Sequence, residues 1–217
     1  MNTVLHVISD RNRRRLPLVD ALVEAAKGGA DVIQIREKKA PASETYTQVK
    51  QLQQHLATNG LAARVYVNDR TDIAIATDMD GVHLAAKSLP IETVKALRGR
   101  ANWHGRIGCS VHHIDEAVQA EKDGADYVTF GHVFASESHP DIPPRGLYAL
   151  RRIVEALSIP VIAIGGIDHT NVGAVLDTGC SGIAVIGAIL DTTDPRGAAE
   201  ELKAAMARAD AHPKVPF

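Results

Sequence analysis

Cysteine and aromatic residues are scarce in this chain of 217 residues. The two cysteines, Cys109 and Cys180, lie far apart and outside any CxxC pair, which argues against a zinc ribbon and against a disulfide framework. Phe, Trp and Tyr together make up 4% of the residues, so Ala, Val, Ile and Leu must supply most of the core.

The chain also lacks an excess of positive charge and a long apolar run. Its 24 Lys and Arg residues are balanced by 26 Asp and Glu residues, whereas nucleic-acid binders usually carry a clear basic excess. No run approaches the roughly 18 apolar residues of a membrane helix. The N-terminal segment places its arginines after its apolar stretch, opposite to the order in a secretory signal. We therefore expect a cytoplasmic protein with no nucleic-acid partner and no membrane partner.

Short β-branched runs alternate with amphipathic or Ala-rich stretches along the whole chain. The runs are continuous rather than alternating, as in parallel strands that are covered on both faces. The predicted strands are Val4–Ser9, Val32–Arg36, Arg64–Asn68, Gly81–Leu84, Arg106–Ser110, Tyr127–Phe130, Val161–Ile164 and Ile183–Ile186. The predicted helices are Leu18–Lys27, Ser43–Thr58, Thr71–Thr77, Ile91–Leu97, Ile114–Asp123, Leu147–Leu157, Asn171–Thr178 and Arg196–Ala209.

This alternation predicts an α/β fold, a (β/α)8 TIM barrel, formed as a single domain by residues 1–217. A doubly wound open sheet is the alternative, but no GxGxxG follows the first strand. Glycines recur at the entry to predicted strands, at Gly29, Gly81, Gly124 and Gly179. We expect them to end helices in the left-handed conformation and to turn the chain into the next strand.

In such a barrel the chemistry lies at the C-terminal ends of the strands. Gly165 and Gly166 follow the seventh predicted strand, and Gly187 follows the eighth. Glycine loops at these two places let backbone amides approach phosphate oxygens closely, so we expect a phosphorylated small molecule there. Tight barrel turns are the alternative.

Charged residues follow the second and third predicted strands. Arg36 and Lys38 lie on the same side of an extended segment and suit a carboxylate or phosphate group, unless they form a solvated salt-bridge cluster with Glu37. Asp69 could bind a metal, although a helix cap is the favoured interpretation. The basic stretch Arg11–Arg15 is interpreted as a solvated loop or a subunit contact.

His132 is the sharpest feature, because the sixth predicted strand delivers it directly to the catalytic face. An imidazole suits proton transfer near neutral pH, although an isolated histidine is often structural. His112 and His113 could join it as a metal trio, but adjacent residues point in different directions and no HxxxH spacing is present. We expect no metal and no cofactor.

Several segments are similar to one known family. IGCSVHHIDEAVQAEKDGADYVTFGHVF, RGL at Arg145–Leu147 and PVIAIGGI at Pro160–Ile167 resemble the thiamine phosphate synthase superfamily, most closely its TenI branch, the thiazole tautomerases. The resemblance covers nearly the whole chain. VND at Val67–Asp69 and GVHL at Gly81–Leu84 are general superfamily motifs, and the GHVF segment is the narrower one.

The resemblance implies two possible activities. The synthases join a pyrimidine diphosphate to a thiazole phosphate with magnesium, but Ser88 stands here in place of an acidic metal ligand, and His132 and His139 replace a proline and a lysine. These departures favour the tautomerase branch. There the GHVF histidine, which is His132 here, is the proposed acid/base catalyst that aromatises a carboxythiazole phosphate.

The resemblance also assigns substrate-binding residues. Gly165, Gly166, Gly187 and the Ile186 backbone would hold the substrate phosphate. Arg36 and Lys38 would face the ring carboxylate or the phosphate, and Asn68 and Ser110 would orient the substrate. The leading hypothesis is a thiazole tautomerase that forms a homo-oligomer such as a dimer. A magnesium-dependent thiamine phosphate synthase and a non-catalytic thiazole-phosphate sensor are the alternatives.

Overall fold

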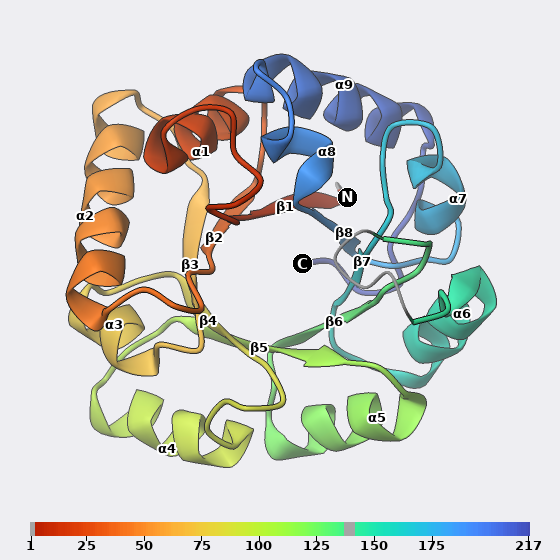
Figure 1. Ribbon diagram of the computed structural model, residues 1–217. Coiled ribbons are helices and arrows are strands. Elements are labelled where there is room, and N and C mark those ends of the chain that lie inside the picture. The colour runs from red at the N-terminus through yellow and green to blue at the C-terminus, as the bar shows by residue number, and fades with distance from the viewer. Residues whose placement is uncertain (1–2, 137–141) are drawn as a thin grey trace.

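Eight parallel strands close into a barrel in the computed structural model, which describes residues 3–136 and 142–217 (Figure 1). Each strand pairs with the next along the chain, and β8 pairs with β1, so the barrel has no free edge. The strands are β1 (Val4–Ile8), β2 (Val32–Ile35), β3 (Arg64–Asn68), β4 (Gly81–Leu84), β5 (Arg106–Val111), β6 (Tyr127–Gly131), β7 (Val161–Ile164) and β8 (Gly182–Val185).

Helices surround the barrel (Figure 1). They are α1 (Leu18–Lys27), α2 (Ala42–Thr58), α3 (Thr71–Ala76), α4 (Ile91–Arg100), α5 (Ile114–Asp123), α6 (Gly146–Ala156), α7 (Val172–Leu176), α8 (Gly187–Leu190) and α9 (Pro195–Arg208). In the part of the chain that the structure describes, no helix is long and apolar enough to cross a membrane.

Both faces of each strand are buried, which explains the continuous apolar runs. Outward-facing residues such as Leu5, Val7 and Ile33 pack against the helices in the larger core cluster. A second, smaller cluster fills the barrel interior and includes Val4, Tyr66, Tyr127, Ile162 and Ala184.

The interior of the barrel is polar on one side and apolar on the other. From β1 to β6, the inward-facing positions include the polar residues His6, Gln34, Asn68, His83, Ser110 and Thr129. On β7 and β8 the corresponding positions hold Ile162, Ile164 and Ala184. A ligand that enters the barrel mouth therefore meets hydrogen-bonding groups on one side and aliphatic side chains on the other.

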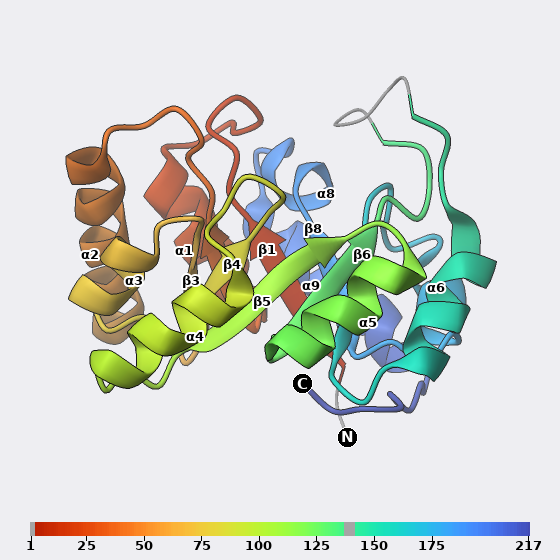
Figure 2. The same ribbon diagram turned by 90° about the horizontal axis from the view of Figure 1, so that it is seen from below.

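The opposite mouth is closed by the C-terminal segment, which lies below the barrel in Figure 2. The ring of Phe217 packs edge-on against Tyr127, with the ring centroids 5.2 Å apart. The guanidinium carbons of Arg64 and Arg106 each lie 4.7 Å from the centre of the same ring. Cation–π attraction and burial thus hold this segment across the lower mouth.

The predicted TIM barrel is confirmed. Each predicted strand and helix is present, with bounds that differ by a few residues at most, and α8 is an additional helix too short to produce a readable periodicity. The glycine prediction is confirmed at Gly29, Gly124 and Gly179, which have positive φ angles. It is wrong at Gly81, which begins β4 in contact with the Tyr66 ring, where a Cβ would lie 2.9 Å from it.

Candidate active site

The loops that follow the strands gather at the upper mouth of the barrel (Figure 2). Parallel strands that run in one direction must end at the same face, and this face carries the site in TIM barrels. The predicted site residues all lie in or just after the C-terminal parts of β2, β3, β5, β6, β7 and β8. The topology therefore brings them to one mouth.

Arg36 and Lys38 give the mouth positive charge beside β2. The backbone amide of Arg36 donates to the Ser9 hydroxyl at 2.8 Å, which fixes the start of this segment against β1. Burial lowers the pKa of Arg36, against the opposing effect of nearby Asp10 and Asp69. The charge of Arg36 in turn lowers the pKa of Lys38. Two crowded cations of this kind favour an anionic ligand that would relieve their repulsion.

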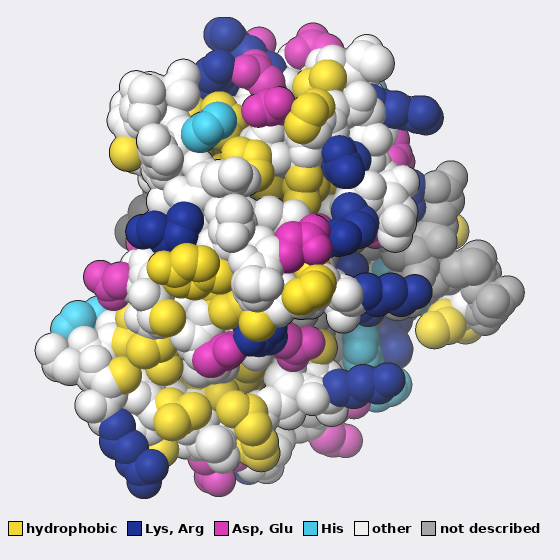
Figure 3. Space-filling view, turned by 60° about the vertical axis from the view of Figure 1, so that its left-hand side comes forward, with side chains coloured by type: hydrophobic (Ala, Val, Ile, Leu, Met, Phe, Trp, Pro, Cys, Tyr) yellow, Lys and Arg dark blue, Asp and Glu magenta, His cyan; other side chains and the backbone are white. Residues whose placement is uncertain are grey.

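Positive side chains are visible on this side of the molecule. Figure 3 shows Lys and Arg side chains along the right-hand edge of the view, which is the face turned toward the viewer in Figure 1. The left-hand part of Figure 3 instead mixes apolar, polar and charged side chains. The gathered positive charge attracts anions toward the upper mouth.

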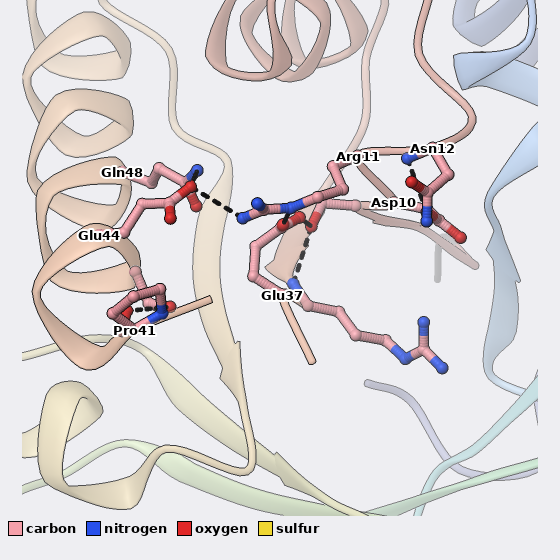
Figure 4. A network of polar contacts seen from close by, with 10 residues as sticks. Asp10, Arg11, Asn12, Glu37, Pro41, Glu44 and Gln48 are labelled. Carbon is pink, nitrogen blue, oxygen red and sulfur yellow. Dashed lines mark hydrogen bonds and ion pairs between the residues drawn. The ribbon is translucent and has the colours of Figure 1, made fainter. Parts of the chain in front are cut away.

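The Glu37 carboxylate is hydrogen-bonded to residues of a different loop, and its charge also favours the charged form of the neighbouring Arg36. Its carboxylate accepts hydrogen bonds from the Ser9 hydroxyl at 3.1 Å and from Arg11 (Figure 4). Arg11 also donates to Glu44 of α2 at 2.8 Å, and these bonds raise the pKa of Arg11. Glu37 is therefore paired with Arg11, while its charge also acts on Arg36, and Arg11 links the β1–α1 loop to α2.

Asp69 lies at the centre of a polar row at the end of β3. Its carboxylate accepts hydrogen bonds from the Asn68 amide, at 3.2 Å, and from the Ser88 hydroxyl. The Asn68 carbonyl oxygen in turn accepts from the buried Gln34 amide at 3.1 Å. No side-chain hydrogen bond caps α3, so the favoured interpretation of Asp69 as a helix cap is wrong.

A second polar group spans β4, β5 and β6. The ring of His83 contacts the Tyr127 hydroxyl through Nδ1 at 3.0 Å and the Ser110 hydroxyl through Nε2 at 2.9 Å. The Thr129 hydroxyl lies 3.4 Å from that of Ser110. The structure thus places Ser110 at the mouth with a buried histidine behind it. Sequence reasoning missed His83 and Gln34, although polar residues at alternate positions of apolar strands were a readable signal.

The two glycine loops lie side by side after β7 and β8. Gly165 and Gly166 both have positive φ angles, and a Cβ on Gly165 would overlap the Cβ of His132. Ile186 precedes α8, and Gly187 begins it. The carboxylate of Asp191, at the end of α8, holds Arg13 of the β1–α1 loop at 2.7 Å. This pairing brings the Arg13 guanidinium next to Gly187, where a Cβ would lie 2.9 Å from its terminal nitrogen.

His132 is buried at the end of β6 and anchors the loop that follows. Its Nε2 lies 2.9 Å from the carbonyl oxygen of Ile142, which can only accept, so Nε2 carries the proton and donates. Its own carbonyl accepts from the Arg145 amide at 3.0 Å, and Arg145 also donates through Nε to the Gly131 carbonyl. These bonds join the two sides of the β6–α6 loop. His139 lies outside the described residues.

Metal-ligating and thiol groups are sparse at the mouth. Among residues 3–136 and 142–217, no three His, Cys, Asp or Glu side chains are grouped so as to hold a metal ion by themselves. Cys109 and Cys180 are buried free thiols, and burial raises their pKa values to about 12 and about 11. Neither thiol has the lowered pKa of a nucleophilic cysteine.

Comparison with known proteins addresses the two activities that the sequence left open. A thiamine-phosphate synthase of Pyrococcus furiosus is 45% identical over 199 residues, which cover 92% of each chain. A thiamine-phosphate synthase of Clostridium novyi is 40% identical over 204 residues, covering 93% of this chain and 98% of the relative.

Solved structures give the same result. Thiamine phosphate pyrophosphorylase from Pyrococcus furiosus matches with a TM-score of 0.85 and 42% sequence identity over 95% of this chain and 96% of that chain. A 3-hexulose-6-phosphate synthase matches with a TM-score of 0.71 at 20% identity, which is a likeness of fold.

These findings overturn the tautomerase hypothesis and its isomerase chemistry, because the similar relatives are named as synthases. The tautomerase hypothesis depended on His132 as the acid/base catalyst and on the absence of a carboxylate at position 88. In the structure His132 anchors a loop, and Ser88 bonds directly to Asp69. The thiamine monophosphate synthase family model matches residues 5–189, and the chain belongs to this family.

Proposed function

We propose that this chain is a thiamine-phosphate synthase, a transferase that joins a pyrimidine diphosphate to a thiazole phosphate and releases pyrophosphate. The observation that carries the proposal is the 45% identity to a protein named thiamine-phosphate synthase over 92% of both chains. The layout of the barrel mouth supports it, because the reaction needs room for two anionic substrates.

The diphosphate is assigned to the β2 side of the mouth. Arg36 and Lys38 lie there, and the pKa of each is lowered, chiefly by burial for Arg36 and by the charge of Arg36 for Lys38. A bound diphosphate would lower the free energy of both cations by offsetting this crowding. Arg36 offers a planar fork of donors that can contact two phosphate oxygens at once.

Asp69 and Ser88 fit a magnesium ion bound together with the diphosphate. Mg²⁺ is commonly held by one or two carboxylates plus substrate phosphates, and the Asp69 carboxylate and Ser88 hydroxyl are in direct contact here. When bound, the ion would neutralise negative charge on the leaving diphosphate. Asn68 and Gln34 keep the Asp69 carboxylate in place through the hydrogen bonds that connect them.

The thiazole phosphate is assigned to the β7 and β8 side. Gly165 and Gly166 leave room for close approach of a phosphate, and the backbone at Ile186 and Gly187 opens a helix whose first amides have no partner within the helix. Asn68 and Ser110, on the polar side, are assigned to orienting the substrates. The homo-oligomer stays a prediction.

The test is synthesis from the two purified substrates. With Mg²⁺ present, the protein should form thiamine phosphate and pyrophosphate in equal amounts, measured by chromatography and by a coupled pyrophosphate assay. D69N should abolish most of this activity. D78N is the matched control, because Asp78 is an exposed aspartate that also has a positive φ, which Asn tolerates, and it lies in the turn before β4, away from the mouth.

Two outcomes would contradict the proposal. Absence of thiamine phosphate with a folded protein and both substrates would remove the synthase assignment. Tight binding of thiazole phosphate without any turnover would favour the sensor alternative instead. Equal activity of D69N and D78N would remove Asp69 from the site while leaving the overall reaction in place.

A further inference from the structure

A row of three residues crosses the barrel wall behind Ser110. His83 of β4 is in register with Gly108 of β5, and Gly108 is in register with Tyr127 of β6. A Cβ at position 108 would overlap the Tyr127 ring, so the glycine is what lets the phenol reach across β5. The Tyr127 hydroxyl thereby lies 3.0 Å from Nδ1 of His83.

The protonation of this row follows from burial. His83 is fully buried, and burial together with the charge of Arg36 lowers its pKa to about 3, so its ring is neutral with one donor and one acceptor nitrogen. Burial raises the pKa of Tyr127, so its hydroxyl keeps its proton. Among the described contacts, Nδ1 of His83 is the acceptor within reach of that buried proton. Buried donors are almost always satisfied, so Nδ1 accepts and Nε2 carries the hydrogen.

The tautomer of His83 determines how the Ser110 hydroxyl at the barrel mouth is hydrogen-bonded. Nε2 of His83 lies 2.9 Å from the Ser110 hydroxyl oxygen and donates to it. The Thr129 hydroxyl oxygen lies 3.3 Å from the same Nε2 and 3.4 Å from the Ser110 oxygen. Because Nε2 carries a hydrogen, it offers Thr129 no lone pair, so the Thr129 hydroxyl donates to Ser110. A serine oxygen has two lone pairs, and these two donors use both. The hydroxyl proton of Ser110 then remains to be donated to another group.

We propose that His83 is a positioning residue, held by Tyr127 in the Nε2–H tautomer, which makes the half-buried Ser110 a hydrogen-bond donor to the substrate. The group it recognises carries a lone pair, either an unprotonated ring nitrogen of the pyrimidine or an oxygen of its diphosphate. The identity of the substrate rests on the proposed function. The tautomer of His83 rests on the barrel interior alone.

The first measurement is the tautomer itself, by nitrogen NMR of protein labelled in its histidine rings. The signal of His83 is identified by its loss in H83N. In the parent protein Nδ1 should be the unprotonated nitrogen and Nε2 the protonated one. Y127F should give a mixture of tautomers. Y66F is the matched control, because Tyr66 is a second fully buried tyrosine of the interior, whose hydroxyl has no partner among the described residues.

The second measurement is ligand binding by calorimetry, with two probes that divide the substrate. One probe is inorganic pyrophosphate with Mg²⁺, and the other is the hydroxymethyl aminopyrimidine without phosphate. S110A should weaken one of them roughly ten-fold, the scale of a single hydrogen bond, and the affected probe identifies the acceptor. Y127F should weaken the same probe, and Y66F should not.

The outcomes separate this proposal from the proposed function. An Nδ1–H tautomer in the parent would overturn the argument, as would equal effects of Y66F and Y127F, which would indicate packing. Unchanged binding of both probes by S110A would remove the donor role. A protein without synthase activity that still shows the Nε2–H tautomer and the Y127F effect would contradict the proposed function alone.

Discussion

Two histidines inside the barrel should make the protein sensitive to mild acid. His6 and His83 are fully buried, and burial is the largest cause that lowers the pKa of each ring to about 3. In the unfolded chain a histidine has a pKa near 6.5. Below that value the unfolded state binds more protons than the folded state, so stability falls as the pH decreases. The contribution of the two neutral rings to the free energy of unfolding is complete above pH 6.5 and is lost as the pH falls from 6.5 to 3.

The magnitude follows from the two pKa values. Lowering the pH from 7.5 to 5.0 should reduce the free energy of unfolding by about 2 kcal/mol for each ring, and by about 4 kcal/mol for both. This is a large part of the ~5–15 kcal/mol that typical domains possess. The carboxylates of Asp72 and Asp168 have lowered pKa values, so they lose their stabilising effect only below about pH 4. That loss lies outside the range from pH 7.5 to 5.0 in which the two histidines are compared.

The assay is urea unfolding at the two pH values, followed by circular dichroism. H6F replaces one ring by an apolar ring that can keep the edge-on packing with Tyr66, and it should halve the acid loss to about 2 kcal/mol. H55Q changes an exposed histidine of α2 and should keep the parent's loss. A parent that loses less than about 1 kcal/mol, or an H6F variant with the same loss as the parent, would refute the reasoning.

Three further outcomes follow from the packing and charge of the barrel. R36M should weaken pyrophosphate binding about ten- to a hundred-fold, whereas R152M on the exposed face of α6 should bind as the parent does, by calorimetry. G131A should lower the free energy of unfolding by about 1–3 kcal/mol in urea titrations, because its Cβ would overlap the Ile164 carbonyl oxygen. F217A should cost at least about 1–2 kcal/mol through two lost cation–π contacts, seen as a lower Tm.

The barrel was readable because its strands are buried on both faces. Runs such as Val161–Ile164 and Gly182–Val185 are apolar without interruption, and glycines mark several helix-to-strand turns. Once the barrel is assumed, its topology places Arg36 and Gly166 at one mouth without any further information. The fold and the position of the site therefore depend on local patterns, which a single sequence displays.

The partners of the site residues depend on contacts between distant positions, and these were not readable. His83 and Tyr127 are 44 residues apart, and the sequence gives no sign that Gly108 opens the path between them. The activity was misjudged for a related reason. Position 88 lacks a carboxylate, but the Ser88 hydroxyl reaches Asp69 only because the loop after β4 folds back toward β3.

The polar half of the barrel interior has a consequence for how the sequence can change. Several hydrogen-bonding groups there are matched to a group on another strand, as Gln34 is to Asn68 on the adjacent strand and His83 is to Tyr127 two strands away. Replacing one member of a pair leaves its partner unpaired in the buried interior. A single replacement therefore lowers the free energy of unfolding by more than half of what replacing both members costs. Directed evolution of substrate preference should therefore advance through changes made to both members of such a pair, while the aliphatic positions of β7 and β8 accept substitutions one at a time.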